Sequence, residues 1–368
     1  MPNLTSTIVN VQATVTAAPA PSQFQQSGAL VSVGGTTLTV GTSQYFGTLA
    51  ELEAVLSTTG NYLEITAMAT TFFAQSSASS SPIGVYVLEL GVQSSVPNGI
   101  TALQTWITDN PGTFYAYLTP ATWDTDGSDL NALAANYSST TGKTYFFVTT
   151  SAATISAYAA TTKAILSVVP SPTALSTEFQ AAAFFYQWLA NNPSSANPAA
   201  PMNFRFAYGV TPWVLTNNQT EINTILSAYG NVILTGAEGG ISTATLRNGT
   251  TMDGNQAMFW YAVDWILVNA KQQLAAAIIN GSNSQPPLYY NQAGINQLLA
   301  LLNTIGATGI KSGLLLSAVM SAIPFTTYTT QYPSNYAAGI YNGFSCVATP
   351  QNGFTSITFY LDATEFVA

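Results

Sequence analysis

Hydrophobic and polar residues alternate at both ends of this chain. The alternation covers residues 4–16 and returns in residues 357–366. A period of two residues is typical of a strand with one buried face, so each end is predicted to be a strand arm. The apolar positions of these arms are Ile8, Val9, Val11 and Val15 at the start, and Ile357, Phe359 and Leu361 at the end.

Pro19 and Pro21 separate the first arm from the rest of the chain. Proline cannot donate a hydrogen bond to a strand ladder, so these residues end the strand and are predicted to form a hinge. A strand cut off in this way must pair with an available sheet edge, in its own subunit or in a neighbour.

Between the arms, strand and helix patterns alternate. Apolar strand patterns occupy residues 83–90, 114–118, 144–149 and 164–169, and helical patterns occupy 45–57, 100–110, 129–137, 155–162 and 176–191. Strands that alternate with helices of roughly ten residues indicate βαβ units and a mostly parallel sheet.

A stretch rich in Pro, Asn and Ala at residues 192–201 is a candidate domain boundary. After it, strands are predicted at 204–210 and 232–235, and helices at 219–229, 255–280 and 292–305. We therefore predict a mixed α/β and α+β fold with four parts. These are an arm and hinge at 1–21, a βαβ-type domain at 22–191, a second α+β domain at 202–350 and a C-terminal arm at 351–368.

Composition narrows the function. Of 368 residues, 15 are acidic, 6 are basic and none is histidine. Enzymes rely on ionisable side chains for acid–base and electrostatic work, and histidine is also the commonest metal ligand. We therefore expect no enzymatic activity, no catalytic residue, no cofactor and no metal.

The net charge of −9 is uneven, since residues 1–142 hold eight carboxylates and no base. This sign opposes contact with phosphate backbones and with anionic lipid, so neither nucleic acid nor a membrane is expected as a partner. Weakly charged surfaces tend to associate, which favours a protein that assembles. The single cysteine, Cys346, is expected to be a small buried residue.

Three motifs could carry chemistry, and each has a plainer interpretation. Gly142-Lys143-Thr144 lacks the earlier glycine of a phosphate-binding loop and precedes a strand, so it is read as a turn. Residues 124–129 hold three aspartates, but their glycine is misplaced for a calcium loop. A turn in which Ser128 or Asp129 caps the next helix is favoured there. Asp264, inside an apolar helix, is expected to pair with a nearby base or to face water.

Residues 248–316 carry the most specific pattern. Asn248 to Gly254 read Asn-Gly-Thr-Thr-Met-Asp-Gly, an Asp264-Trp265 pair follows, and Tyr290-Asn-Gln-Ala-Gly-Ile295 opens a leucine-rich helix. This order resembles the tail sheath proteins of contractile bacteriophages. Phe46 to Glu51, and Phe72-Phe73-Ala74 before the strand at 85–90, resemble earlier parts of that family.

The resemblance implies a structural subunit in the tail sheath of a virion, assembled in the host cytoplasm. Such subunits form hexameric rings stacked helically around a tail tube. Their arms add strands to neighbouring subunits, and contraction drives the tube through the host envelope. The implied partners are further copies of the chain, the tail tube protein, and the baseplate and tail terminator proteins.

Two other readings stay open. A shell or surface-layer subunit would also suit low charge and abundant Ser, Thr and Asn. A flavodoxin-like ligand-binding domain over residues 83–170 would need a phosphate-cradling loop after Leu90, where Gly91 to Ser95 offer hydroxyls but no base.

Overall fold

The computed structural model describes residues 24–79, 82–139, 141–158, 162–193, 198–236 and 239–356. The apolar positions of the predicted arms and the two hinge prolines lie outside these ranges. Strand formation by the arms therefore stays a prediction, and so does the division of the chain into four parts.

The first half of the chain builds a six-stranded sheet from β1 (Gly28–Ser32), β2 (Ser43–Phe46), β3 (Val85–Glu89), β4 (Ala116–Leu118), β5 (Tyr145–Thr149) and β6 (Ile165–Val168). The spatial order is β2-β3-β1-β4-β5-β6. The pairs from β3 to β6 are parallel, and β2 joins the edge antiparallel to β3. Because β3 and β4 lie on opposite sides of β1, the sheet is doubly wound.

Helices cover both faces of this sheet because successive strand residues point in opposite directions. Leu30 of β1 belongs to the cluster containing α3 (Tyr62–Ser77) and α6 (Gln180–Leu189). Its neighbours Ala29 and Val31 belong to the cluster containing α4 (Val96–Asp109) and α5 (Gly127–Ala135). All five β1 residues are buried, as a parallel sheet covered on two faces requires.

A smaller antiparallel sheet lies beside β6 and extends the six-stranded sheet. We call the two sheets and the helices that pack on them the body. The smaller sheet consists of β7 (Phe206–Ala207), β9 (Ile241–Arg247) and β8 (Val232–Gly236) in that spatial order, and α7 (Gln219–Ser227) precedes β8. Asn231 joins the two sheets, because it bridges to Val168 and its side chain donates to the carbonyl of Ser167 at 2.9 Å.

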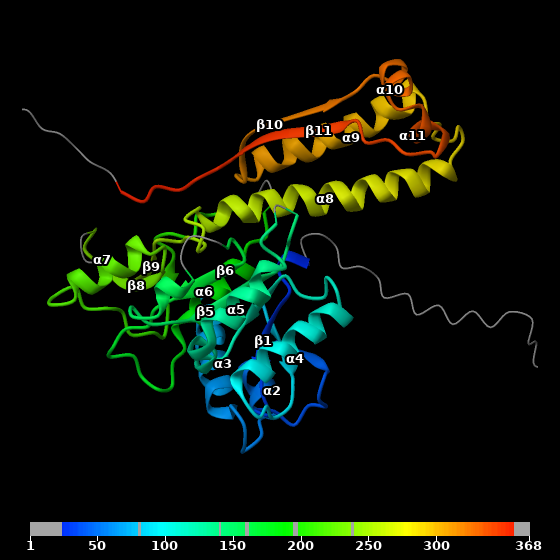
Figure 1. The fold of residues 1–368 in the computed structure, drawn as a ribbon. Helices are drawn as coiled ribbons and strands as arrows, with labels where there is room; N and C mark the ends of the chain where they lie inside the picture. Colours follow the sequence, from blue (N-terminus) through cyan, green and yellow to red (C-terminus); the bar gives the residue numbers. More distant parts are fainter. Residues whose placement is uncertain are drawn as a thin grey trace, which may run out of the picture.

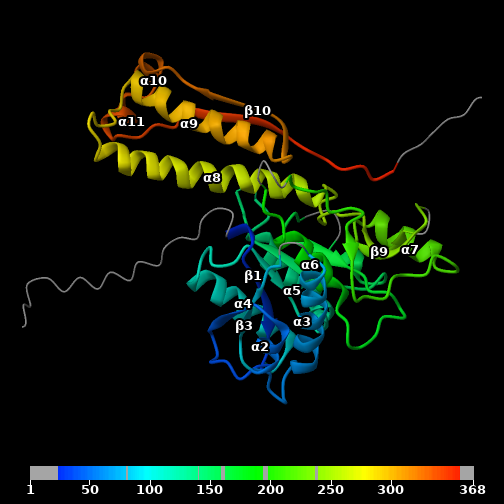
Figure 2. The same cartoon turned by 180° about the vertical axis from the view of Figure 1, so that it is seen from behind.

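The remainder forms a C-terminal layer, which we define as residues 257–356. Its elements are α8 (Ala257–Ser282), α9 (Gln292–Lys311), β10 (Leu315–Ala322), α10 (Phe325–Gln331), α11 (Pro333–Ala337) and β11 (Phe344–Pro350). In both views α8 runs between the body and the rest of the layer (Figures 1 and 2). α9 packs on α8, and the β10–β11 hairpin packs on α9.

The predicted mixed α/β and α+β class is confirmed. Two local expectations were wrong. Residues 45–57 are not one helix, because residues 43–46 pair with β3 as β2 and α2 covers only Leu49–Glu53. Residues 155–157 form a single 3₁₀ turn where a longer helix was expected. Phe72 and Phe73, likened to a segment before a core strand, lie inside α3.

Candidate assembly surfaces

The β10–β11 hairpin has one buried face and one exposed face. Leu315 and Met320 point toward α9 and are buried. On the outer face Val319 lies directly opposite Val347, and these side chains are 64% and 72% exposed. An apolar cross-strand pair in water is unusual for a monomer and marks a surface suited to contact.

This hairpin also has two free edges. It is a two-stranded sheet, so within the described part of the chain the outer backbone of β10 and of β11 has no strand partner. Unpaired N–H and C=O groups along an edge are a template for strands from another chain. The hairpin can therefore accept one added strand on each side.

Small residues bring α9 close to the hairpin. A Cβ atom on Gly309 would lie 2.6 Å from Cδ1 of Leu315, and one on Gly306 would lie 3.0 Å from Cβ of Ala318. A larger residue at Gly309 would therefore require the Leu315 side chain to move. These two glycines let α9 pack closely on the hairpin.

The first residues of the predicted C-terminal arm, 351–356, are held against the body. The side chain of Gln256 donates to the carbonyl of Gly353 at 2.9 Å and accepts from the Gly353 amide at 2.9 Å. Asn203 donates to the carbonyl of Phe354 at 3.3 Å. The starting point of residues 357–368 is therefore set by contacts from two distant parts of the chain.

A buried polar cluster joins α8 to the main sheet. The hydroxyls of Tyr145 and Tyr115 donate to Oδ2 of Asp264 at 2.7 and 3.1 Å, and Gln25 donates to the carbonyl of Tyr261 at 3.2 Å. Trp188 stacks on Tyr115 with ring centroids 5.6 Å apart. These contacts place one carboxylate between the layers.

Asp264 is fully buried, so the expectation that it might face water was wrong. Burial raises the pKa of Asp264 to about 6, against the opposing effect of Lys163 and the two tyrosine hydroxyls. Lys163 is itself buried; it donates to the carbonyl of Gly142 at 2.5 Å and lies 4.6 Å from the Trp260 ring centroid. Burial lowers the pKa of Lys163.

A second buried carboxylate, Glu89, closes the end of the sheet where a flavodoxin-like ligand would bind. It accepts hydrogen bonds from the backbone amides of Gly34, Thr36 and Gly91, and from the hydroxyls of Ser32 and Thr36, at 2.6 to 3.1 Å. Backbone amides at this position hold a phosphate in nucleotide-binding folds. Here the protein's own carboxylate already occupies them, which argues against the ligand-binding alternative.

The other sequence motifs have structural roles. Gly142 lies in the turn before β5 and accepts from Lys163. Asp124 accepts from the hydroxyls of Thr154 and Tyr158 at 2.6 and 2.8 Å. The expected cap was wrong, because α5 begins at Gly127, after a 3₁₀ turn. Across the described ranges, no group of three or more acidic, His or Cys side chains could hold a metal ion.

The outer part of the C-terminal layer is almost free of charge. Between residues 272 and 356 the one charged side chain is that of Lys311. Cys346 lies on β11 and is exposed, so the expectation that it is buried was wrong. It is paired with Met320, so its side chain lies on the α9 side of the hairpin but is not covered there. Within the described ranges no helix combines the length and apolarity needed to cross a bilayer.

Similarity to known proteins is found in the structure and not in the sequence. No protein-family model matches the chain, and no curated protein matches it. A chain in the contracted helical sheath of the anti-feeding prophage has a TM-score of 0.60 at 11% identity, covering 97% of this chain and 99% of that one. A chain of the anti-feeding prophage baseplate has a TM-score of 0.59 at 13% identity, covering 94% of both.

The sheath tail protein of Listeria innocua is similar over 83% of this chain and 93% of its own length, with a TM-score of 0.50 and 9% identity. The molecule therefore has the fold of contractile tail sheath proteins. The resemblance inferred from residues 248–316 is confirmed at the level of the fold.

Proposed function

We propose that this chain is the structural subunit of a contractile tail sheath. It polymerises around a tail tube, and its contraction drives the tube through a host envelope. The observation that carries the proposal is the β10–β11 hairpin, whose two free edges and exposed Val319–Val347 pair lie on a sheath-type fold. In this role the chain performs no catalysis, and it resides in the tail of a virion-like particle after assembly in the host cytoplasm.

In this proposal the arms complete the hairpin of a neighbouring subunit. The C-terminal arm leaves from the segment held by Gln256, and the N-terminal arm leaves from Phe24 beyond the predicted hinge at Pro19 and Pro21. Backbone ladders from the arms would keep subunits linked in hexameric rings while the bodies repack during contraction. The tail tube, baseplate and terminator proteins are the further partners.

Negative-stain electron microscopy of the purified full-length protein tests the proposal. Striated tubes are expected for the complete chain. A variant lacking residues 1–15 and a variant lacking residues 357–368 should each stay folded, with an unchanged circular dichroism spectrum, and form no tubes. Normal tubes from both truncated proteins would overturn the strand-exchange mechanism, whereas planar arrays from the complete chain would favour a surface-layer subunit.

A further inference from the structure

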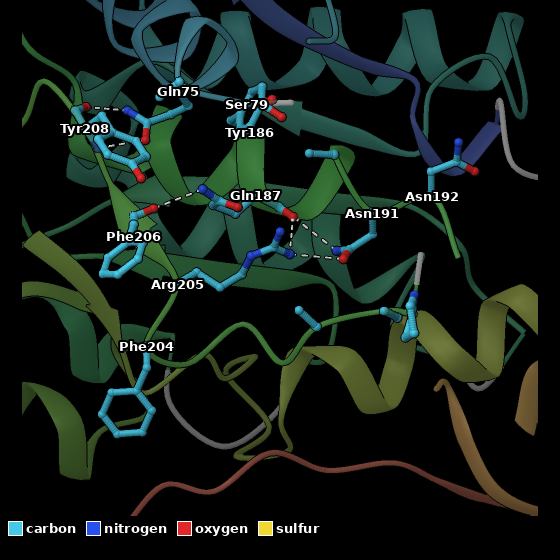
Figure 3. A pocket seen from close by; sticks show the side chains of 15 residues that line it. Gln75, Ser79, Tyr186, Gln187, Asn191, Asn192, Phe204, Arg205, Phe206 and Tyr208 are labelled. Atoms are coloured by element: carbon cyan, nitrogen blue, oxygen red, sulfur yellow. Dashed lines mark hydrogen bonds between the residues drawn. The ribbon is translucent and has the colours of Figure 1, made fainter. Parts of the chain in front are cut away.

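A polar cavity of about 370 Å³ lies between the small sheet and the carboxyl-terminal ends of α3 and α6. Its walls include Gln75, Tyr186, Gln187, Asn191, Arg205 and Tyr208 (Figure 3). No acidic side chain lines it. Arg205 is the one charged residue among these walls, so the cavity has a net positive charge.

The guanidinium of Arg205 is held by neutral acceptors. It donates through Nη1 to the carbonyl of Gln187 at 3.3 Å and to Oδ1 of Asn191 at 3.0 Å (Figure 3). Asn191 is fixed in that orientation because its Nδ2 donates to the carbonyls of Gln187 and Trp188. Of the five N–H donors of an arginine, those on Nε and Nη2 have no acceptor within the described residues.

Two further features beside Arg205 are energetically unfavourable in the isolated subunit. Phe204, immediately before Arg205, has a φ of 66°, a left-handed conformation that is unfavourable for a bulky residue. Tyr186 is buried, and its hydroxyl has no hydrogen-bond partner in the described protein. Burial lowers the pKa of Arg205, as expected for a cation that lacks an anionic partner. The described protein does not supply a partner for this donor, so an ordered water or a bound group must satisfy it.

We propose that this cavity receives a carboxylate side chain from a second copy of the chain. Arg205 would bind the carboxylate with its free N–H groups, and the Tyr186 hydroxyl would donate a further hydrogen bond. A guanidinium and a carboxylate match as planar, two-pronged partners. The carbonyl ends of α3 and α6 carry negative partial charge, which disfavours a phosphate dianion and tolerates a monoanion paired with the arginine.

The source of the carboxylate follows from the composition of the chain. Each subunit has 15 acidic and 6 basic residues, so most carboxylates have no base to pair with in their own subunit. Glu53, Asp109 and Glu221 are exposed on the described surface. In a polymer of identical subunits, the acidic side chain nearest to Arg205 from outside belongs to another copy. This step rests on the proposed sheath function.

Titration of the unassembled full-length protein with the α-amide of N-acetylglutamate, whose one carboxylate is that of the side chain, tests the cavity by calorimetry independently of assembly. Binding is expected for the wild type, and no binding for Arg205→Gln. Tyr186→Phe should bind several-fold more weakly and still fold, because its hydroxyl has no partner to lose. Arg247→Gln is the matched control and should bind as the wild type does, since Arg247 does not line the cavity. Equal binding by the wild type and Arg205→Gln, or binding of inorganic phosphate instead of the N-acetylglutamate α-amide, would overturn the carboxylate site.

Assembly tests where the carboxylate comes from. Arg205→Gln should raise the protein concentration needed for tube formation by about tenfold or more, the scale of a lost, partly desolvated charge pair. One of Glu53→Gln, Asp109→Asn and Glu221→Gln should cause the same loss, and combining it with Arg205→Gln should add little. If Arg205→Gln loses binding of the N-acetylglutamate α-amide but assembles normally, a second copy is not the source. If the wild type forms no tubes, the sheath function fails while the titration still decides the cavity.

Discussion

The side chain of Gln256 and the backbone of Gly353 form a closed pair of hydrogen bonds, both 2.9 Å long, between the start of α8 and the segment after β11. An amide side chain that bonds a backbone amide in this way acts like one rung of a β ladder. Gly353 fits there because a Cβ atom would lie 2.4 Å from Cβ of Pro201. The pair therefore fixes where the C-terminal arm leaves the body.

Replacing Gln256 by alanine should release this exit segment. Loss of two hydrogen bonds is expected to lower the free energy of unfolding by about 1–3 kcal/mol, and tube formation should fall more strongly because the arm no longer starts from a fixed point. Urea unfolding and electron microscopy measure the two effects. Gln297→Ala, an exposed glutamine on α9, serves as control; equal effects of both substitutions would contradict the role of the pair.

The Val319–Val347 pair should matter for assembly and little for folding. Val347→Lys removes exposed apolar surface, so the stability of the subunit should change by no more than about 0.5 kcal/mol. Tube formation should be lost, because a charge would be buried between subunits.

Leu63→Lys is the matched control for Val347→Lys, since Leu63 is 68% exposed on α3, far from the hairpin in sequence. Thermal unfolding and sedimentation of assembled material provide the measurements. Tubes formed by Val347→Lys at the wild-type concentration would show that the outer face of the hairpin stays exposed in the assembly.

Asp264 predicts an unusual pH dependence. Its pKa is raised from 3.8 to about 6 in the folded protein, so between these values the folded state keeps a proton that the unfolded chain has released. The contribution of this group is therefore full below about pH 4 and is lost as pH rises through 6. Its size is on the order of 3 kcal/mol.

Comparing the wild type with Asp264→Asn isolates this effect, because the other carboxylates are common to both proteins. The difference in the free energy of unfolding should shift in favour of the asparagine variant as pH rises from 4 to 7. Denaturant titrations at several pH values measure it, with the exposed Asp109→Asn as control. A difference that stays constant across this range would show that Asp264 is not protonated in the folded state.

Glu89→Gln should be strongly destabilising. The carboxylate accepts five hydrogen bonds from β1, the following loop and Gly91, and an amide nitrogen would face donors in place of an acceptor. A loss of about 2–4 kcal/mol is expected from buried charge-assisted bonds. Differential scanning calorimetry tests this, with the exposed Glu53→Gln as control. An unchanged melting temperature would mean that these hydrogen bonds do not depend on the carboxylate charge.

The sequence predicts the helices and strands whose apolar residues form an unbroken run or recur at a regular spacing. The strands at 85–89, 145–149 and 165–168 and the helices α8 and α9 follow from apolar runs and helical spacing. Helix α3 is not predicted because it is buried on nearly all sides, so that polar Thr71 and Gln75 lie in the core, bonded to the amide of Phe179 and to Tyr208. Such a helix has no polar stripe for periodicity to detect.

The hairpin and the cavity are missed for a different reason. β10 is an apolar run in which most outward-facing residues are exposed. Its sequence therefore does not alternate between apolar and polar residues as a strand with one exposed face would. Arg205 and Tyr186 are 19 positions apart, and nothing in their spacing brings them together; they share a cavity because β7 lies beside the end of α6. Asp264 is recognisable as unusual, but its tyrosine partners lie in β5 and just before β4, more than 100 residues earlier.

The near absence of charge between residues 272 and 356 also determines how the subunit responds to its surroundings. Contacts made by apolar and uncharged polar groups weaken on cooling and strengthen in sulfate, while moderate concentrations of simple salt affect them little. For the contacts made by this part of the chain, temperature should therefore matter more than ionic strength. A preparation held cold would stay dispersed, and warming alone would start polymerisation.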